Sequence, residues 1–174
     1  MRVSLNEIKQ YINGELPPVD ELVKRINEQL GGVEDVIDFG DIYKDAVIVR
    51  VVSCGKHPNA DKLHVCLVDD AGVVEDVARN EDGYVKVVCG APNVHADMFA
   101  VWLPPKAVVP STYHDDEPFI LGARELRGEM SNGMLASPKE LGLGDSHEGI
   151  LELDPDEWKP TSVDIKAGTS FAHA

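Results

Sequence analysis

The stretch AVIVRVVS, residues 46–53, is apolar on both faces of an extended strand except at Arg50. A strand with one face in solvent alternates apolar and polar residues, whereas this run predicts a strand that is buried on much of both faces. Such burial is typical of a strand that curls through a small β-barrel.

Further short runs rich in valine and isoleucine follow, separated by Gly, Pro, Asn and Asp. Together with 46–53, the expected strands are residues 64–69, 73–78, 84–89, 99–103 and 120–126, with a further strand at 149–153. Five or six short strands within about 110 residues indicate a small closed or partly open barrel.

The N-terminal part of the chain predicts helices instead. Ser4 and Glu7 have the spacing of a capping box, in which hydroxyl and carboxylate satisfy each other's backbone donors. Apolar residues recur at helical spacing again in residues 20–30. A second capping box, Ser137 with Glu140, predicts a further helix of one or two turns.

Charge and composition disfavour several classes of function. The 174 residues carry 31 acidic and 16 basic side chains, a formal net charge of −15. This charge opposes nonspecific binding to nucleic acid or to an anionic membrane, because both need a basic surface, but it does not exclude a local basic site. We expect no DNA and no membrane as partners. No apolar run approaches the roughly 18 residues of a membrane span. Glu7 and Lys9 interrupt the apolar region that a signal peptide would need.

Cysteines and sequence motifs give no sign of catalysis or metal binding. Cys54, Cys66 and Cys89 are odd in number and form no CxxC, which indicates reduced thiols in a cytoplasmic protein. Cys54 and His57 have metal-ligand spacing, but no second pair accompanies them, so we expect no metal site. Motifs of phosphate-binding loops, zinc proteases and serine hydrolases are missing, so we expect no catalytic residues.

One cluster of polar residues connects the first two expected strands. It reads KHPNADKLH, residues 56–64. In an oligonucleotide-binding barrel, this loop lies at the rim of the binding face. Lys56, His57, Asn59 and Lys62 offer cationic and hydrogen-bonding groups there. For the two lysines, RNA binding and plain solubility explain the pattern equally well.

A second cluster follows the strand expected at 120–126. Arg127 can clamp a phosphate or stack on a base. Ser131 and Asn132 can donate to phosphate or sugar oxygens. The candidate RNA-binding residues are therefore Lys56, His57, Asn59, Lys62, Arg127, Ser131 and Asn132.

Taken in order, these segments resemble the N-terminal region of bacterial phenylalanine–tRNA ligase β subunits. The resemblance spans essentially the whole chain. The segments that carry it are VSLNEIK (3–9), HPNADKL (57–63), VCGAPN (88–93), LRG (126–128), SNGML (131–135) and ELGL (140–143).

The resemblance implies a mixed α+β fold in two parts. An oligonucleotide-binding (OB) β-barrel, residues 39–150, would be inserted into a small discontinuous domain made of residues 1–38 and 151–174. The family's β subunit is several times longer than this chain, so the discontinuous domain would be truncated here.

The resemblance also implies partners and cofactors. The chain would bind tRNA and assemble with an α subunit and a second β subunit. ATP and Mg²⁺ would serve the full enzyme, whose attachment of phenylalanine to tRNA would take place on the α subunit.

Among the departures from the family's pattern, one bears directly on the second cluster. A small hydrophobic residue usually follows Leu-Arg-Gly in the family, but Glu129 stands there in this chain. A carboxylate beside Arg127 is expected to weaken an anion site. Two alternatives stay open. One is a subunit-packing module that binds no RNA, which the charge of −15 favours, and the other is a stand-alone tRNA-binding protein.

Overall fold

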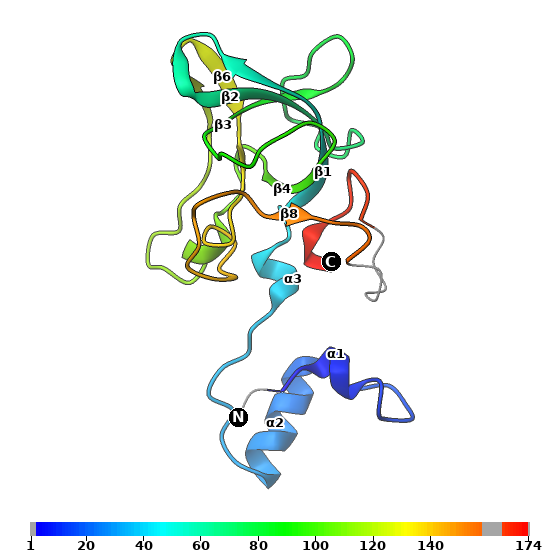
Figure 1. Ribbon diagram of the computed structural model, residues 1–174. Coiled ribbons are helices and arrows are strands. Elements are labelled where there is room, and N and C mark those ends of the chain that lie inside the picture. The colour runs from blue at the N-terminus through cyan, green and yellow to red at the C-terminus, as the bar shows by residue number, and fades with distance from the viewer. Residues whose placement is uncertain (1–2, 158–164, 174) are drawn as a thin grey trace. The chain divides into compact units, whose positions relative to one another are not determined.

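The computed structural model describes residues 3–157 and 165–173 (Figure 1). Its contacts divide the chain between Asp38 and Phe39 into two units, residues 1–38 and 39–174. The division falls where the sequence changes from helical spacing to short runs of β-branched residues. Within the described residues, no helix has the length and apolar character needed to cross a membrane.

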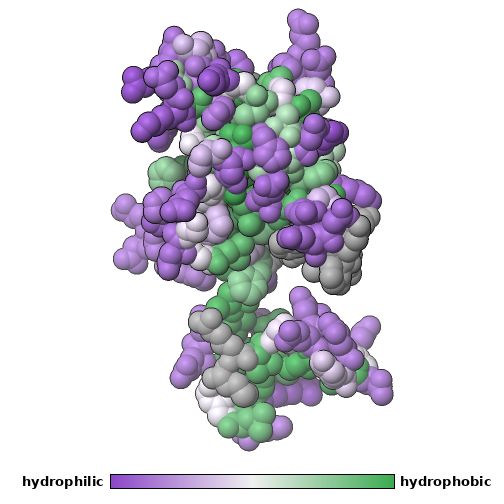
Figure 2. All heavy atoms as spheres, in the orientation of Figure 1, coloured by the Kyte–Doolittle hydropathy of each residue, from purple (hydrophilic) through white to green (hydrophobic). Residues whose placement is uncertain are grey.

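The first unit contains two helices, α1 (Leu5–Ile8) and α2 (Val19–Gln29). The Ser4 hydroxyl oxygen accepts the Glu7 backbone N–H at 3.3 Å, which confirms the predicted N-cap, although α1 is only one turn long. Neither helix has a buried residue. Figure 2 accordingly shows hydrophobic residues at the surface of this unit.

The second unit is built on an antiparallel sheet that follows the short helix α3 (Phe39–Ile42). The strand order is β3-β2-β1-β4-β7, β8 pairs with β4, and β5 and β6 form a separate hairpin. The strands are β1 (Val47–His57), β2 (Ala60–Asp69), β3 (Val85–Cys89), β4 (Phe99–Leu103), β5 (Ala123–Leu126), β6 (Glu129–Asn132), β7 (Met134–Leu135) and β8 (Glu152–Leu153). Two 3-10 turns, η1 (Pro110–Thr112) and η2 (Phe171–His173), complete the elements.

Strand β1 is buried on both faces, as the run at 46–53 predicts. Val49 packs in one hydrophobic cluster, whereas its neighbour Ile48 packs with Leu103 in a second cluster. Arg50 is exposed and forms an ion pair with Asp97. The core therefore lies on both sides of β1, and this strand fixes the positions of the loops at its ends.

Two local predictions are wrong. Residues 73–78 do not form a strand, because the chain curls there around the buried carboxylate of Asp70, which accepts the Val74 N–H at 3.0 Å. Ser137 and Glu140 exchange the predicted capping hydrogen bonds, at 2.8 and 3.4 Å, but turns follow them instead of a helix.

The sheet does not close into a barrel by backbone pairing within the described residues. Strand β3 pairs with β2 along one edge, and the only backbone bridge found at its other edge within the described residues is that of Val85 with Arg79. Along its other edge, side chains of β6 take the place of a strand: Ser131 Oγ accepts the Val88 N–H at 2.9 Å, and Asn132 Nδ2 donates to the Lys86 carbonyl at 3.1 Å. The fold is thus mixed α+β with an open antiparallel sheet.

The described residues after 151 pack within the second unit. Strand β8 pairs with β4, and the Ile48 N–H donates to the Thr169 carbonyl at 2.8 Å. Phe171 stacks edge-on against Tyr43 with ring centroids 5.2 Å apart. That residues 151–174 join residues 1–38 in one discontinuous domain stays a prediction, and positions 158–164 and 174 of that segment lie outside the described residues.

Candidate nucleic-acid interface

The two candidate loops are joined at the tips of their hairpins. His57 ends β1 at the β1–β2 tip, and Leu126 ends β5 at the β5–β6 tip. His57 Nε2 lies 2.9 Å from the Leu126 carbonyl oxygen, and Asn59 Nδ2 donates to the Arg127 carbonyl at 3.0 Å. Segments that are 68 residues apart in the sequence therefore form one continuous rim.

The hydrogen bonds of His57 assign a role to each ring nitrogen. The ring is buried, with 5% of its surface exposed. Its Nδ1 accepts the Asn59 N–H at 3.0 Å, while Nε2 faces the Leu126 carbonyl, which can only accept. In this arrangement Nδ1 is the acceptor and Nε2 is the donor. His57 acts as a link between the tips, and its nitrogens are not available to a metal or to RNA.

Exposed cations gather on these two hairpins. Among the described residues, Arg50, Arg79, Lys86 and Lys106 of the second unit are held in ion pairs. None of the ion pairs found there involves Lys56, Lys62, Arg124 or Arg127, four exposed side chains of the two hairpins. Lys44 and Lys139 of the same unit are likewise exposed and in none of these ion pairs, so the rim differs from them in bringing four such cations together. Asp61, Glu125 and Glu129 lie on the same hairpins, and Glu129 is paired with Lys86 of β3, so four cations against three carboxylates leave the rim weakly positive in a chain of net charge −15.

Arg124 is not among the predicted RNA contacts, because it lies inside the strand expected at 120–126. In the structure it is exposed on β5 opposite Ser131 of β6. The signal that could identify it is the pair of adjacent charged residues, Arg124 and Glu125, within Ala123–Leu126, because neighbouring strand residues point to opposite faces and neither face is then wholly apolar.

Glu129 does not stand as a free negative charge beside Arg127. Lys86 Nζ lies 2.9 Å from its carboxylate. This hydrogen bond, together with the lysine's charge, lowers the pKa of Glu129 below its usual value. The carboxylate is thus compensated from β3, and its expected weakening of an anion site is reduced.

Two of the predicted RNA contacts lie inside the fold. Ser131 and Asn132 are 2% and 6% exposed, and their side chains hold the free edge of β3. Their burial does not support a contact with RNA. Of the seven predicted residues, the structure brings Lys56, Asn59, Lys62 and Arg127 together as exposed side chains on the rim.

The potential metal ligands among the described residues are histidine, cysteine and carboxylate side chains. Within the described residues, no group of three His, Cys, Asp or Glu side chains is placed to hold a metal ion. The Cys54 thiol lies 3.4 Å from Cys66 Sγ. All three cysteines are free thiols.

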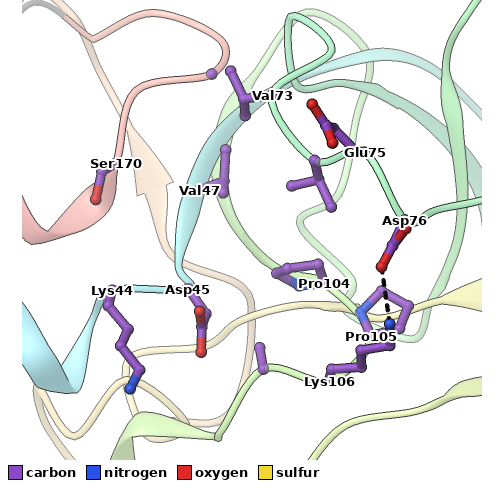
Figure 3. Close-up of a pocket in the computed structure, with 13 residues that line it drawn as sticks. Lys44, Asp45, Val47, Val73, Glu75, Asp76, Pro104, Pro105, Lys106 and Ser170 are labelled. Carbon is purple, nitrogen blue, oxygen red and sulfur yellow. Dashed lines mark hydrogen bonds and ion pairs between the residues drawn. The ribbon is translucent and has the colours of Figure 1, made fainter.

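An open groove of about 620 Å³ lies near the start of β1, at the end of the strand opposite His57 (Figure 3). Val47, Val73 and Pro104 form part of its apolar lining. Figure 3 shows Asp76 and Lys106 directed toward one another, and they form an ion pair at 3.1 Å. Acidic side chains outnumber basic ones among its lining residues, so the groove is a poor site for a polyanion.

Comparisons with known proteins agree with the segments that carry the resemblance. The chain is 35% identical over 156 residues to the phenylalanine–tRNA ligase β subunit of Nitrobacter winogradskyi and 36% identical over 156 residues to that of Rhodopseudomonas palustris. Each match covers 90% of this chain and 18% of the relative, so the chain spans about a fifth of the length of these relatives. The predicted resemblance to this β subunit is confirmed.

A solved structure and a sequence family also match. The MetRS related protein from Pyrococcus horikoshii superposes with a TM-score of 0.44 at 14% identity, covering 78% of this chain and 97% of that one. The family described as "Putative tRNA binding domain" matches residues 46–161, which include the sheet and both hairpins of the rim. The chain therefore belongs to the tRNA-binding domain family.

Proposed function

We propose that this chain is a non-catalytic tRNA-binding module whose rim contacts the RNA backbone. The observation that carries the proposal is the gathering of exposed cations, free of the ion pairs found elsewhere, on two hydrogen-bonded hairpin tips. Membership of the tRNA-binding domain family supports the same ligand. In a chain of net charge −15, a local positive rim directs a polyanion to one place on the surface.

The rim chemistry favours positioning of the tRNA over reading of its sequence. Lysine offers a compact charge to a phosphate, whereas the planar guanidinium of Arg127 can form paired hydrogen bonds or stack on a base. Phosphate contacts set orientation and register but carry no sequence information directly. Lys56, Lys62, Arg124 and Arg127 would therefore orient the RNA while other parts of an assembly act on it.

The finer fold that accompanies this proposal is an OB-type barrel. Two features support it: β1 is buried on both faces, and side chains of β6 bridge the gap beside β3. In OB folds, the loop between the first two strands flanks the ligand-binding face. In an OB-type fold, the β1–β2 tip of this chain, with Lys56 and Lys62, would take that place.

The parent assembly is also part of the proposal. Similarity to phenylalanine–tRNA ligase β subunits supports a role in the attachment of phenylalanine to tRNA, next to an α subunit and a second β subunit. ATP and Mg²⁺ would be used by the full enzyme. The residues of this chain would take no part in the reaction that attaches phenylalanine to tRNA.

The test compares two double variants of equal charge. Lys56→Ala/Lys62→Ala removes rim lysines, whereas Lys44→Ala/Lys139→Ala removes two exposed lysines of the same unit away from the tips. Binding of fluorescently labelled bacterial tRNA is measured by anisotropy across a salt series. The rim variant should weaken binding and reduce the slope of log K against log salt by roughly one to two, at about 0.7–0.9 per phosphate contact. Equal effects of the two variants would exclude a specific rim.

A subunit-packing module is the second candidate. It is favoured by the exposed apolar side chains of the first unit, where neither helix has a buried residue. If packing is the only function, the 174-residue chain should bind tRNA weakly and equally in both variants. This candidate would be contradicted if tRNA binding by the parent chain depended steeply on salt and only the Lys56→Ala/Lys62→Ala variant reduced that dependence.

A further inference from the structure

Arg127 occupies a backbone conformation that arginine rarely adopts. It lies with Gly128 in the two-residue turn between the paired residues Leu126 and Glu129, and the φ angles of the two turn residues are +54° and +94°. A hairpin turn with positive φ at both positions favours Asn-Gly or Gly-Gly, because a side chain crowds the backbone in this left-handed region. Such strain persists where the surroundings determine the conformation, and it often marks a functional site.

The surroundings that hold this turn come from the neighbouring hairpin tip. Asn59 Nδ2 donates to the Arg127 carbonyl at 3.0 Å, and His57 Nε2 donates to the preceding carbonyl, that of Leu126, at 2.9 Å. His57 Nδ1 in turn accepts the Asn59 N–H at 3.0 Å, which orients the segment that carries the amide. Two successive carbonyls of the turn are thus held by one three-residue segment, while the Arg127 side chain remains exposed.

From this geometry we infer that Asn59 is a positioning residue for Arg127, with His57 as its support. The inference deepens the proposed function and rests on it. Asn59 uses its amide on the turn of the neighbouring hairpin, so it supports an RNA contact made by Arg127, on the same rim as Lys56 and Lys62. The strained turn is kept because it places a guanidinium, which Asn or Gly could not supply, at the point where the two hairpins meet.

The first test separates turn stability from RNA binding. Arg127→Asn places a favoured residue in the turn and removes the guanidinium. The variant should unfold at a higher temperature than the parent chain but bind labelled tRNA more weakly. Arg127→Lys keeps the charge and should retain part of the affinity. A parallel loss of stability and affinity in Arg127→Asn would overturn the assignment of strain to this residue.

The second test is a double-mutant cycle on tRNA affinity. Asn59→Ala should weaken binding by roughly three- to ten-fold, the effect of about one hydrogen bond. In an Arg127→Ala background it should have no further effect, because a positioning residue acts only through the residue that it positions. Asn59→Ala should also reduce the salt slope by about as much as Arg127→Ala, a change that simple destabilisation does not produce. Asn6→Ala, at an exposed position of α1, is the control and should change nothing.

The outcomes distinguish this inference from the proposed function. If Asn59→Ala weakens binding equally with and without Arg127, then Asn59 contacts RNA directly and the positioning role is wrong. If only Arg127→Ala weakens binding, the proposed function stands and the positioning role is again wrong. If Lys56→Ala/Lys62→Ala and Arg127→Ala all leave affinity unchanged, the proposed function itself fails. As a control, the unfolding midpoint of each variant is measured to check that the chain is folded in every comparison.

Discussion

The hydroxyl of Ser131 accepts the backbone N–H of Val88 at 2.9 Å and donates to the Gly133 carbonyl at 2.9 Å. This side chain therefore satisfies a backbone N–H of strand β3, as the backbone carbonyl of a neighbouring strand does elsewhere in the sheet. Asn132 repeats the arrangement one residue later with the Lys86 carbonyl. Two polar side chains thus hold a sheet edge that would otherwise leave buried backbone groups unsatisfied.

Replacement of Ser131 tests this role. Ser131→Ala leaves the buried Val88 N–H without its partner, and the chain should lose about 1–3 kcal/mol of unfolding free energy. Urea denaturation followed by circular dichroism measures the loss. Ser53→Ala, at an exposed strand position, is the control and should change stability by less than about 0.5 kcal/mol. Equal stability of the two variants would show that water replaces the hydroxyl.

Gly133 is required by the turn that follows. Its φ is +79°, and a Cβ added there would lie 2.1 Å from the Leu103 carbonyl oxygen. Gly133→Ala should therefore destabilise the chain by more than about 2 kcal/mol, because both the backbone and the neighbouring strand must shift. Gly144→Ala is the control, since nothing lies within 4 Å of a Cβ added at that position. The two variants are compared by their thermal unfolding midpoints. Similar midpoints would contradict the steric argument.

Much of the sheet could be predicted from the sequence because its strands are runs of β-branched residues with a recognisable period. The run at 46–53 predicts burial on both faces, and Val49 and Ile48 confirm it in separate clusters. The same criterion fails at 73–78. There the requirement of the buried Asp70 for backbone donors outweighs strand propensity, and that requirement arises only in the folded chain.

The candidate site could be predicted only in part, since its residues come together through long-range contacts. The polar character of Ser131 and Asn132 suggests surface, but the free edge of β3 makes them interior residues. Asn59 contacts the backbone carbonyl of Arg127, and every residue type has this group. The identity of Arg127 therefore gives no sign of the contact. What the sequence does show is the type of residue in each loop.

The buried pair Asp70–Arg79 predicts a dependence of stability on pH. Asp70 is fully buried, and Arg79 contacts its two carboxylate oxygens at 2.6 and 2.8 Å. Burial alone would raise the pKa of Asp70, but the hydrogen bonds and charge of Arg79 and the N–H groups of Val74 and Gly72 outweigh it and lower the pKa. The stabilisation is complete above the unfolded pKa of about 3.9 and is lost as the pH falls through the lower folded value.

Asp70→Asn measures this contribution. Its unfolding free energy should lie below that of the parent chain by a constant amount between pH 5 and 7, which are about one unit or more above the unfolded pKa. The difference should narrow as the pH falls below about 4. As a control, Asp76→Asn removes an exposed ion pair with Lys106 and should lower the unfolding free energy by less than about 1 kcal/mol. A difference that grows toward acid pH would mean that the pKa of Asp70 is raised instead.

The thiols should react in two classes, because only Cys54 is partly exposed. Burial raises the pKa of Cys66 and of Cys89, so both are protonated at neutral pH as well as shielded from reagents. A disulfide reagent such as DTNB should modify one thiol per chain quickly and two slowly, and all three at one rate in denaturant. Cys54→Ser should remove the fast phase, whereas Cys89→Ser should leave it intact. Two fast thiols in the folded chain would show that Cys66 or Cys89 is reached by solvent.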